Sequence, residues 1–389
     1  MDAVNATREI FWQIPFSYKV AMYVFFFVAL GIMAKGLYEK YQYIKEANNN
    51  GKLLPEKLNW KRFLDSIFFT GKVTRDGYVG FYHSLIYYGF MILLIATELV
   101  AIHADTPMKP YQGTTYIIIS FLADFAGVAL LVGLAFAYKR RYIDKPDYLK
   151  ATKPYRELFM YGMLFSLVFL GYVIEGLRIY GAGMPEGEQV WSPVGWLIAS
   201  FIGQFSMSDQ ALTTTYRGLW MFHMLNTMVF IASISYSKFL HIIAAPFAAL
   251  VTPARRGAVM TPMDFEDETA ETFGLGKKSE MTPKMRLDAL ACVECGRCTQ
   301  VCPANLAGKP LDPKTIITKM RDATVGTKED VDFWEKNLYS PVELDSCTTC
   351  GACMEECPVN IEHIQEIMGL KRYKALTLGE IPPEAATAV

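Results

Sequence analysis

Long apolar runs before about residue 250 place the strongest limit on how this chain folds. Hydrophobic residues make up 52% of the sequence, and they are concentrated in these runs. A helix needs about 20 apolar residues to cross a hydrocarbon layer of about 30 Å. Five runs are long enough, at residues 18–35, 79–103, 115–138, 158–176 and 216–245. Residues 1–250 therefore predict an all-α membrane bundle of five transmembrane helices, with run 191–205 as an interfacial or re-entrant helix.

Lysine and arginine are distributed unevenly between the connections of these runs. Nine, counting Lys35 at its end, lie after the first run and seven follow the third, whereas the loop after the second offers only Lys109 and residues 179–216 offer none. Such residues mark the cytoplasmic side of a bilayer. We therefore expect a multi-pass protein of the inner (cytoplasmic) membrane, with its N-terminus outside and everything after the fifth run in the cytoplasm. The net charge of −1 gives no indication of nucleic-acid binding.

All eight cysteines lie between Cys292 and Cys357, in two copies of the pattern C-x-x-C-x-x-C-x-x-x-C-P. This rhythm is typical of bacterial ferredoxins with two [4Fe–4S] clusters, in which three close thiolates hold one cluster and the fourth reaches the other. A zinc site would need only one C-x-x-C pair per half, and a cytoplasmic location disfavours disulfides. The expected ligands are Cys292, Cys295, Cys298 and Cys357 for cluster one, and Cys347, Cys350, Cys353 and Cys302 for cluster two.

The remaining sequence predicts how the second half is divided. We expect a linker over 251–285, a mostly helical ferredoxin-like domain with two [4Fe–4S] clusters over 286–375, and a tail over 376–389. Helical periodicity over 313–337 predicts a helix-containing insertion between the two motifs, which enlarges the domain. Gly296 and Gly351 lie where the backbone must approach the cluster closely. His363 is interpreted as a structural hydrogen-bonding residue and not as a ligand.

Four of the five histidines lie in two apolar runs, His83 and His103 in the second and His223 and His241 in the fifth. Polar residues at membrane depth are usually functional, and imidazole is a common axial haem ligand. On a continuous helix, the 18 residues from His223 to His241 make five turns, which places both rings on one face about 27 Å apart. Because the two helices are antiparallel, we expect two haems b. His83 pairs with His241 near the cytoplasm, and His103 with His223 near the outer face.

Two interpretations of His103 remain open. It follows His83 by 20 residues, which leaves the two rings about 200° apart on a straight helix. A kink or bulge would restore the pairing with His223. Without one, only the inner haem has matched ligands, and His103 is a hydrogen-bonded interfacial residue.

Ionisable residues in the outer half of the bundle indicate a second possible site. Glu175 and Arg178 are three residues apart, so they could form an ion pair within one helix. The functional interpretation is proton exchange with a quinone near the outer haem. The residues considered for this quinone site are Glu98, Asp124, Glu175 and Arg178.

The membrane half resembles the gamma subunit of respiratory nitrate reductase and the cytochrome b subunit of heterodisulfide reductase, in which five spans hold two haems b. His83, His223 and His241 carry that resemblance, whereas His103 lies further along its helix than the outer ligand of those proteins. The stretches Thr261-Pro-Met-Asp-Phe-Glu-Asp and Ala307-Gly-Lys-Pro-Leu-Asp-Pro-Lys, with the two cysteine motifs, look like membrane-anchored iron–sulfur oxidoreductases of the heterodisulfide-reductase type. Some of those pass electrons between electron-transfer flavoprotein and menaquinone. Longer relatives continue into cysteine-rich CCG domains, whereas this sequence has no cysteine beyond Cys357.

Together these patterns predict an electron-transfer subunit of a respiratory complex, an oxidoreductase that works between a quinone, menaquinone or another, and a cytoplasmic partner. The resemblance implies that this partner is a CCG-domain iron–sulfur protein or a flavoprotein, or both. No Gly-rich nucleotide fingerprint follows a strand, so catalysis at the cytoplasmic end is expected on another subunit. The alternatives are a membrane anchor and assembly platform with structural haem, or a membrane sensor of redox state.

Overall fold

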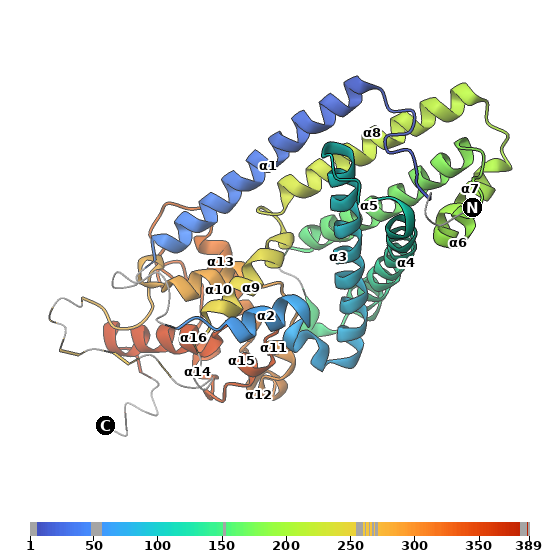
Figure 1. Ribbon diagram of the computed structural model, residues 1–389. Helices are drawn as coiled ribbons and strands as arrows, with labels where there is room; N and C mark the ends of the chain where they lie inside the picture. The colour runs from blue at the N-terminus through green and yellow to red at the C-terminus, as the bar shows by residue number, and fades with distance from the viewer. Residues whose placement is uncertain are drawn as a thin grey trace. The chain divides into compact units, whose positions relative to one another are not determined.

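The computed structural model describes residues 6–47, 57–150, 153–253 and 271–381, with the single positions 260, 262, 263, 265, 266, 268 and 387. Helices dominate these residues (Figure 1), whose only β pairing is an isolated bridge between Lys277 and Asp332. The predicted helical class is therefore confirmed. The chain forms two compact units built from separate stretches. Unit 1 is Met1–Ala34, Thr74–Asp144 and Tyr155–Ser237, and unit 2 is Lys35–Val73, Lys145–Pro154 and Lys238–Val389.

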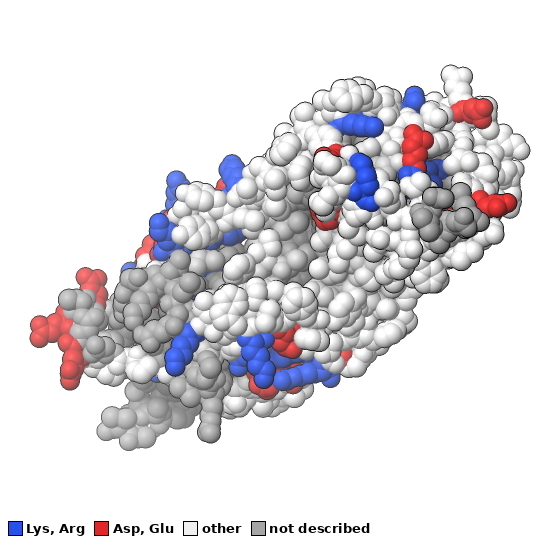
Figure 2. Space-filling model, viewed as in Figure 1, with Lys and Arg blue, Asp and Glu red and all other residues white. Residues whose placement is uncertain are grey.

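Unit 1 holds most of the long apolar helices. Among the described residues, four helices are long and apolar enough to cross a membrane, or five if one bent pair counts as a single span. Figure 2 shows a broad surface without charged side chains over the middle of α3 and α4. The four helices are α1 (Phe16–Lys45, which begins in this unit), α3 (Gly77–Asp105), α4 (Gly113–Tyr138, extended by a π-helical turn to Asp144) and α5 (Pro154–Gly181).

Two glycines bring α3 and α4 close together. A Cβ on Gly89 would lie 2.7 Å from the carbonyl oxygen of Ala126, and one on Gly133 would lie 2.8 Å from that of Tyr82. Small residues at a crossing point let two membrane helices approach backbone to backbone. This pairing fixes the position of α3, which carries His83 and His103.

The fifth predicted span is interrupted. Helix α8 (Asp209–Ser233) ends where the Ser233 hydroxyl donates to the Phe230 carbonyl at 2.8 Å, and helix resumes with the 3₁₀ turn Lys238–Leu240 and α9 (His241–Val251). Serine hydroxyls compete for backbone acceptors in this way and weaken helices locally. The prediction of one continuous helix over 216–245 is therefore wrong. The five-turn relation between His223 and His241 is lost with it.

Run 191–205 forms two short helices, α6 (Glu188–Trp191) and α7 (Pro193–Gly203). The 11 residues of α7 extend about 16 Å at 1.5 Å per residue, about half of what a span needs. The prediction that this run is no sixth span is confirmed, and its place at the membrane surface stays a prediction.

Unit 2 contains α9 and a set of short helices around an apolar core. The core includes Leu275, Met281, Ile316, Phe333 and Leu344, each at most 1% exposed. The remaining helices are α2 (Trp60–Phe68), α10 (Pro283–Ala291), α11 (Arg297–Gln300), α12 (Pro303–Leu306), α13 (Pro313–Thr324), α14 (Pro341–Asp345), α15 (Ala352–Glu356) and α16 (His363–Arg372), with 3₁₀ turns at Gly71–Arg75, Asp147–Leu149 and Lys278–Glu280 and a π-helical turn at Tyr373–Thr377.

The boundaries inside unit 2 differ from those expected. Leu275 and Met281, which fall in the predicted linker 251–285, are part of the folded core. Most of 254–270 and much of the tail 376–389 lie outside the described residues. The predicted insertion is helical only in α13, because the chain leaves the helix at Val325 and Gly326 follows with a φ of +87°. Residues 325–337 form loops and turns. The insertion therefore contains a helix, as predicted, but this helix is shorter than the periodic segment 313–337.

Candidate metal centres

The two cysteine motifs adopt the same backbone course, and each is called a wrap below. In the first wrap Glu294 and Gly296 have φ values of +60° and +74°, and in the second Thr349 and Gly351 have +59° and +78°. Side-chain-bearing residues rarely occupy this left-handed region, so Glu294 and Thr349 are held there by their surroundings. Each wrap then enters a short helix, α11 or α15. The three close thiols of each wrap are therefore carried on the same backbone conformation.

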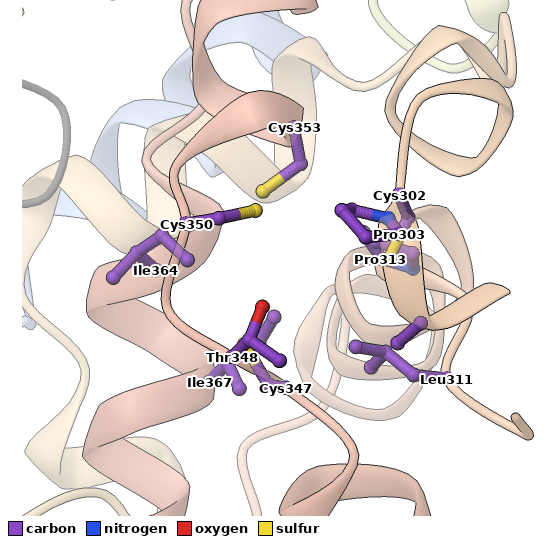
Figure 3. Close-up of a pocket in the computed structure, with 11 residues that line it drawn as sticks. Cys302, Pro303, Leu311, Pro313, Cys347, Thr348, Cys350, Cys353, Ile364 and Ile367 are labelled. Carbon is purple, nitrogen blue, oxygen red and sulfur yellow. The ribbon is translucent and has the colours of Figure 1, made fainter. Parts of the chain in front are cut away.

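The cluster-two thiols surround one cavity. Its empty volume is about 300 Å³ including its open mouth, and Figure 3 shows the sulfurs of Cys350 and Cys353 turned into the gap that faces Cys302. Apolar side chains, among them Leu311 and Ile367, complete the walls, while Cys350 at the edge of the set is exposed. The cysteines that line the cavity are Cys302, Cys347, Cys350 and Cys353. The structure thus brings together the four thiols of one expected set, from both motifs.

Electrostatic neighbours divide the eight thiols in the same way. Burial raises the pKa of Cys298 well above its ordinary value, and the thiols that raise it further are Cys295, Cys357 and Cys292. Burial raises the pKa of Cys353 to about 12, and the thiols that add to it are Cys347, Cys302 and Cys350. Four close thiols that repel one another as thiolates call for a strongly cationic centre among them, because metal binding is what deprotonates such groups.

Backbone amides supply further support to the sulfurs. The Thr349 N–H donates to Cys347 Sγ and the Ile361 N–H donates to Cys357 Sγ, both at 3.4 Å. Hydrogen bonds to cluster sulfurs are one of the means by which proteins set cluster potentials. Among the described residues, no three His, Cys, Asp or Glu side chains converge as ligands of a single ion. A [4Fe–4S] cluster does not require such convergence, because each of its four thiolates binds a different iron.

Basic side chains of the first wrap and of α13 bind the carbonyls of two loops of unit 2, an interaction that the sequence did not predict. Arg297, between two cysteines of the wrap, donates to the carbonyls of Lys72 and Val73 at 2.7 and 3.0 Å. On α13, Lys314 donates to the carbonyl of Tyr148 at 3.0 Å. Cluster binding specifies no residue type at position 297, so an arginine there was the only sign of this contact in the sequence.

His241 has the hydrogen-bonding arrangement of a metal ligand. Its Nδ1 lies 2.5 Å from the carbonyl oxygen of Lys238, and since a carbonyl only accepts, Nδ1 carries the proton. Metal-bound imidazoles commonly donate their other N–H in this way, which fixes the tautomer. Nε2 is therefore left with its lone pair, and the residue fits an axial haem ligand.

The other three membrane histidines differ in how well their surroundings suit an axial haem ligand. His223 fits: its Nδ1 is buried without a hydrogen-bond partner among the described residues, and a Cβ on Gly171 would face its ring at 3.9 Å. The His83 ring lies parallel to that of Tyr87, with 6.4 Å between centroids. His103 does not fit as placed, because its Nδ1 accepts from the Tyr111 N–H at 3.1 Å and the proton of the neutral ring is then on Nε2. His83 and His241 belong to different units, so their pairing stays a prediction.

His363 is buried at the start of α16, with Nδ1 3.2 Å from the Ile361 carbonyl. Burial lowers its pKa to about 4, so the ring is neutral. This geometry agrees with the structural role expected from the sequence.

Glu175 and Arg178 form an ion pair, as the structural alternative proposed. Arg178 Nη2 lies 2.7 Å from Glu175 and 3.2 Å from Glu188, while Arg8 reaches Glu175 at 2.7 Å. Tyr116 donates to Glu188 at 2.9 Å. Two cations and two carboxylates thus compensate one another inside unit 1, which favours a structural role for the network.

The other two candidate quinone residues are Asp124 on α4 and Glu98 on α3. Asp124 accepts from the Val194 and Gly195 N–H groups at 2.7 and 3.3 Å and so caps the start of α7. Glu98 is exposed on α3. Asp124 lies close to the ion-pair network, because a Cβ on Gly195, whose N–H it accepts, would lie 2.9 Å from Glu175 Cγ. A quinone site formed by Glu98, Asp124, Glu175 and Arg178 stays a prediction.

Comparison with known proteins identifies the cysteine region. Residues 291–361 match the model of the 4Fe-4S dicluster domain, so the chain carries such a domain. Over nearly its whole length the chain is similar to EtfAB:quinone oxidoreductase of Syntrophomonas wolfei, with 31% identity over 95% of this chain and 56% of the relative. No solved structure matches.

Two further similarities point to the same kind of protein. The probable iron-sulfur-binding oxidoreductase FadF of Bacillus subtilis is 26% identical over 83% of this chain and 51% of its own length. A probable membrane-anchored ferredoxin of Chromohalobacter salexigens is 32% identical over 34% of this chain and 23% of its own length. The chain spans about half the length of the curated relatives that it matches most extensively. These relatives support an iron–sulfur redox protein with a membrane anchor, and the resemblance to the nitrate reductase gamma subunit stays a prediction.

Proposed function

We propose that this chain moves electrons between a quinone in the cytoplasmic membrane and a redox partner in the cytoplasm. The observation that carries the proposal is the division of eight cysteines into two four-thiol sets, in the same unit as an imidazole whose Nε2 is free to bind haem iron. Clusters and haem b exchange single electrons, so they would supply the redox chemistry. The relative named as an EtfAB:quinone oxidoreductase supports quinone as one substrate.

The chain's own residues bind, orient and insulate these groups. The four thiolates of each set would bind the irons of one cluster, and apolar neighbours such as Leu311 and Ile367 would pack against cluster two. The Thr349 and Ile361 amides stabilise charge on the sulfurs. The Lys238 carbonyl holds the His241 ring in the tautomer that exposes Nε2.

Haem binding is better supported at the inner site than at the outer one. His241 and His83 are proposed as inner ligands, on the fit of His241 and on the position of His83 in the first turns of α3. The outer site rests on His223 alone, because the Tyr111 N–H engages His103. We accordingly propose one haem b with two protein ligands and assign no second pair.

The partner and the orientation follow from the same proposal. The lysine and arginine distribution supports an N-terminus outside and a cytoplasmic unit 2. A cytoplasmic iron–sulfur protein with CCG domains or a flavoprotein would then exchange electrons with the clusters. Menaquinone is the proposed quinone.

A reduction experiment with the purified full-length chain tests the function. A menaquinol analogue is added to the oxidised protein in detergent, and the haem b and iron–sulfur absorbance are recorded against dithionite as the full-reduction reference. We expect the quinol to reduce the haem in the wild type, and His241→Ala to lose that absorbance while retaining its non-haem iron. Haem that dithionite reduces and quinol does not would remove quinone from the proposal and favour the anchor with structural haem.

A further inference from the structure

Helix α9 packs against the cluster-one cysteines. One apolar core contains Leu240, Ala244 and Ala248 of this segment with Cys357, and Cys292 packs against it. The core around Cys302 and Cys347 contains no residue of α9 among those described. Helix α9 begins at His241, the proposed haem ligand. The same helix therefore carries this ligand and packs against the cluster-one thiols.

A charged side chain inside the first wrap strengthens this connection. Glu294 is 0% exposed and lies between Cys292 and Cys295. Its carboxylate is 3.5 Å from Lys238 Nζ and 2.8 Å from Arg321 Nη2. The backbone carbonyl of the same Lys238 accepts the Nδ1 proton of His241. An ion pair and a hydrogen bond therefore join the first wrap to the imidazole through one residue.

The second wrap provides an internal comparison. Thr349 occupies the position of Glu294, with φ of +59° against +60°, and its hydroxyl contacts Met368 Sδ at 3.5 Å. The left-handed backbone is thus common to both wraps, whereas the buried carboxylate belongs to the first. Backbone geometry does not require Glu294, so its charge has another role. Cys350 of the second wrap is exposed, which leaves that set open to solvent.

We propose that cluster one is the cluster adjacent to the haem, and that Lys238 and Glu294 position the two groups and set their potentials, while cluster two exchanges electrons with the soluble partner. This inference rests on the proposed function for the identity of the cofactors. Fixed charges beside a cluster shift its potential, because the reduced cluster carries one more negative charge. Arg321 and Lys238 favour reduction of cluster one, and Glu294 opposes it.

The test is a redox titration of the full chain, followed by electron paramagnetic resonance for the clusters and by absorbance for the haem. Cys357→Ser and Cys350→Ser first assign the two cluster signals. Glu294→Gln is expected to raise the midpoint potential of cluster one, Lys238→Met to lower it, and the double variant to return it toward the wild-type value. The potential of cluster two should stay unchanged in these variants, and the Thr349→Val control should leave the potential of cluster one unchanged.

Two results would overturn the proposal: a shift of cluster two as large as that of cluster one in Glu294→Gln, or no shift of either cluster. If Glu294→Gln does not retain its full non-haem iron, Glu294→Asp, which keeps the charge, should retain it together with a near-native potential. If Glu294→Gln lost cluster two and kept cluster one, the assignment of Glu294 to cluster one would be refuted. Failure of quinol to reduce the haem concerns the proposed function alone, because these potential shifts are measured with chemical mediators.

Discussion

Alanine at Gly296 tests how tightly the first wrap docks on the loop that contains Tyr148. A Cβ at Gly296 would lie 2.2 Å from the Tyr148 carbonyl oxygen, which must retreat by about 1.2 Å to reach an ordinary contact of 3.4 Å. The φ of +74° costs an L-residue about 1–2 kcal/mol, and the overpacking costs about 1–3 kcal/mol more. The total loss of stability is therefore about 2–5 kcal/mol.

Gly308→Ala is the matched control. Gly308 has a φ of +77°, and nothing lies within 4 Å of its Cβ position, so this variant bears the backbone cost without the clash. Thermal unfolding of the full chain is followed by circular dichroism and by the loss of iron–sulfur absorbance. For a unit of this size each kcal/mol corresponds to about 2–4 °C, so Gly296→Ala should unfold about 2–12 °C below Gly308→Ala.

Equal unfolding temperatures for the two variants would refute the close approach of the wrap to the Tyr148 loop. A lower temperature for Gly308→Ala than for Gly296→Ala would refute it as well. Both variants should unfold below the wild type, because each carries the same left-handed backbone.

The division of the thiols predicts that Cys357→Ser loses cluster one alone, so iron analysis should fall from about eight to about four non-haem irons per chain; loss of nearly all iron would contradict the division. Arg178→Gln removes a cation from the buried carboxylate of Glu188 and should cost about 3–5 kcal/mol, measured by unfolding in detergent. A cost below about 1 kcal/mol would show that Arg8 compensates. Burial raises the pKa of Glu366 well above its ordinary 4.5, and the charge of Asp288 adds to the shift. Because the folded pKa lies above the unfolded one, the stability that Glu366 contributes is complete below about pH 4.5 and is lost as pH rises through the folded pKa. Glu366→Gln should therefore flatten the alkaline fall in stability, and parallel curves for variant and wild type from denaturant unfolding at several pH values would count against this account.

Some features could be predicted from the sequence because they depend on neighbours along the chain. Three thiols of a wrap lie within seven residues, and Gly296 and Gly351 allow the turn between them. Apolar runs likewise indicate the length of a span, and the predicted bounds of α3 and α4 agree with the observed ones within two residues. Helix α1 continues ten residues beyond its apolar run to Lys45, because polar residues can extend a helix past the span. The ion pair of Glu175 and Arg178 follows from their spacing of three residues on one helix.

The membrane histidines could not be paired from their spacing. A separation of 18 residues implies one face only if the helix is continuous, and α8 ends at Ser233. His103 has the residue type of a haem ligand, yet the Tyr111 N–H occupies its Nδ1. Hydropathy and residue type do not reveal a break in the hydrogen-bond ladder or the partner of a ring nitrogen.

The sequence by itself determined the thiol motifs, the apolar spans and the chemistry that those residue types permit. Only the tertiary structure decided that Glu294 meets Lys238, that Arg297 donates to carbonyls more than 200 residues earlier in the chain, and that Lys238 orients the His241 ring. The physical reason is that the sequence contains many backbone carbonyls and many charged residues that could serve equally well as partners. Packing alone selects which of them lies within hydrogen-bonding distance.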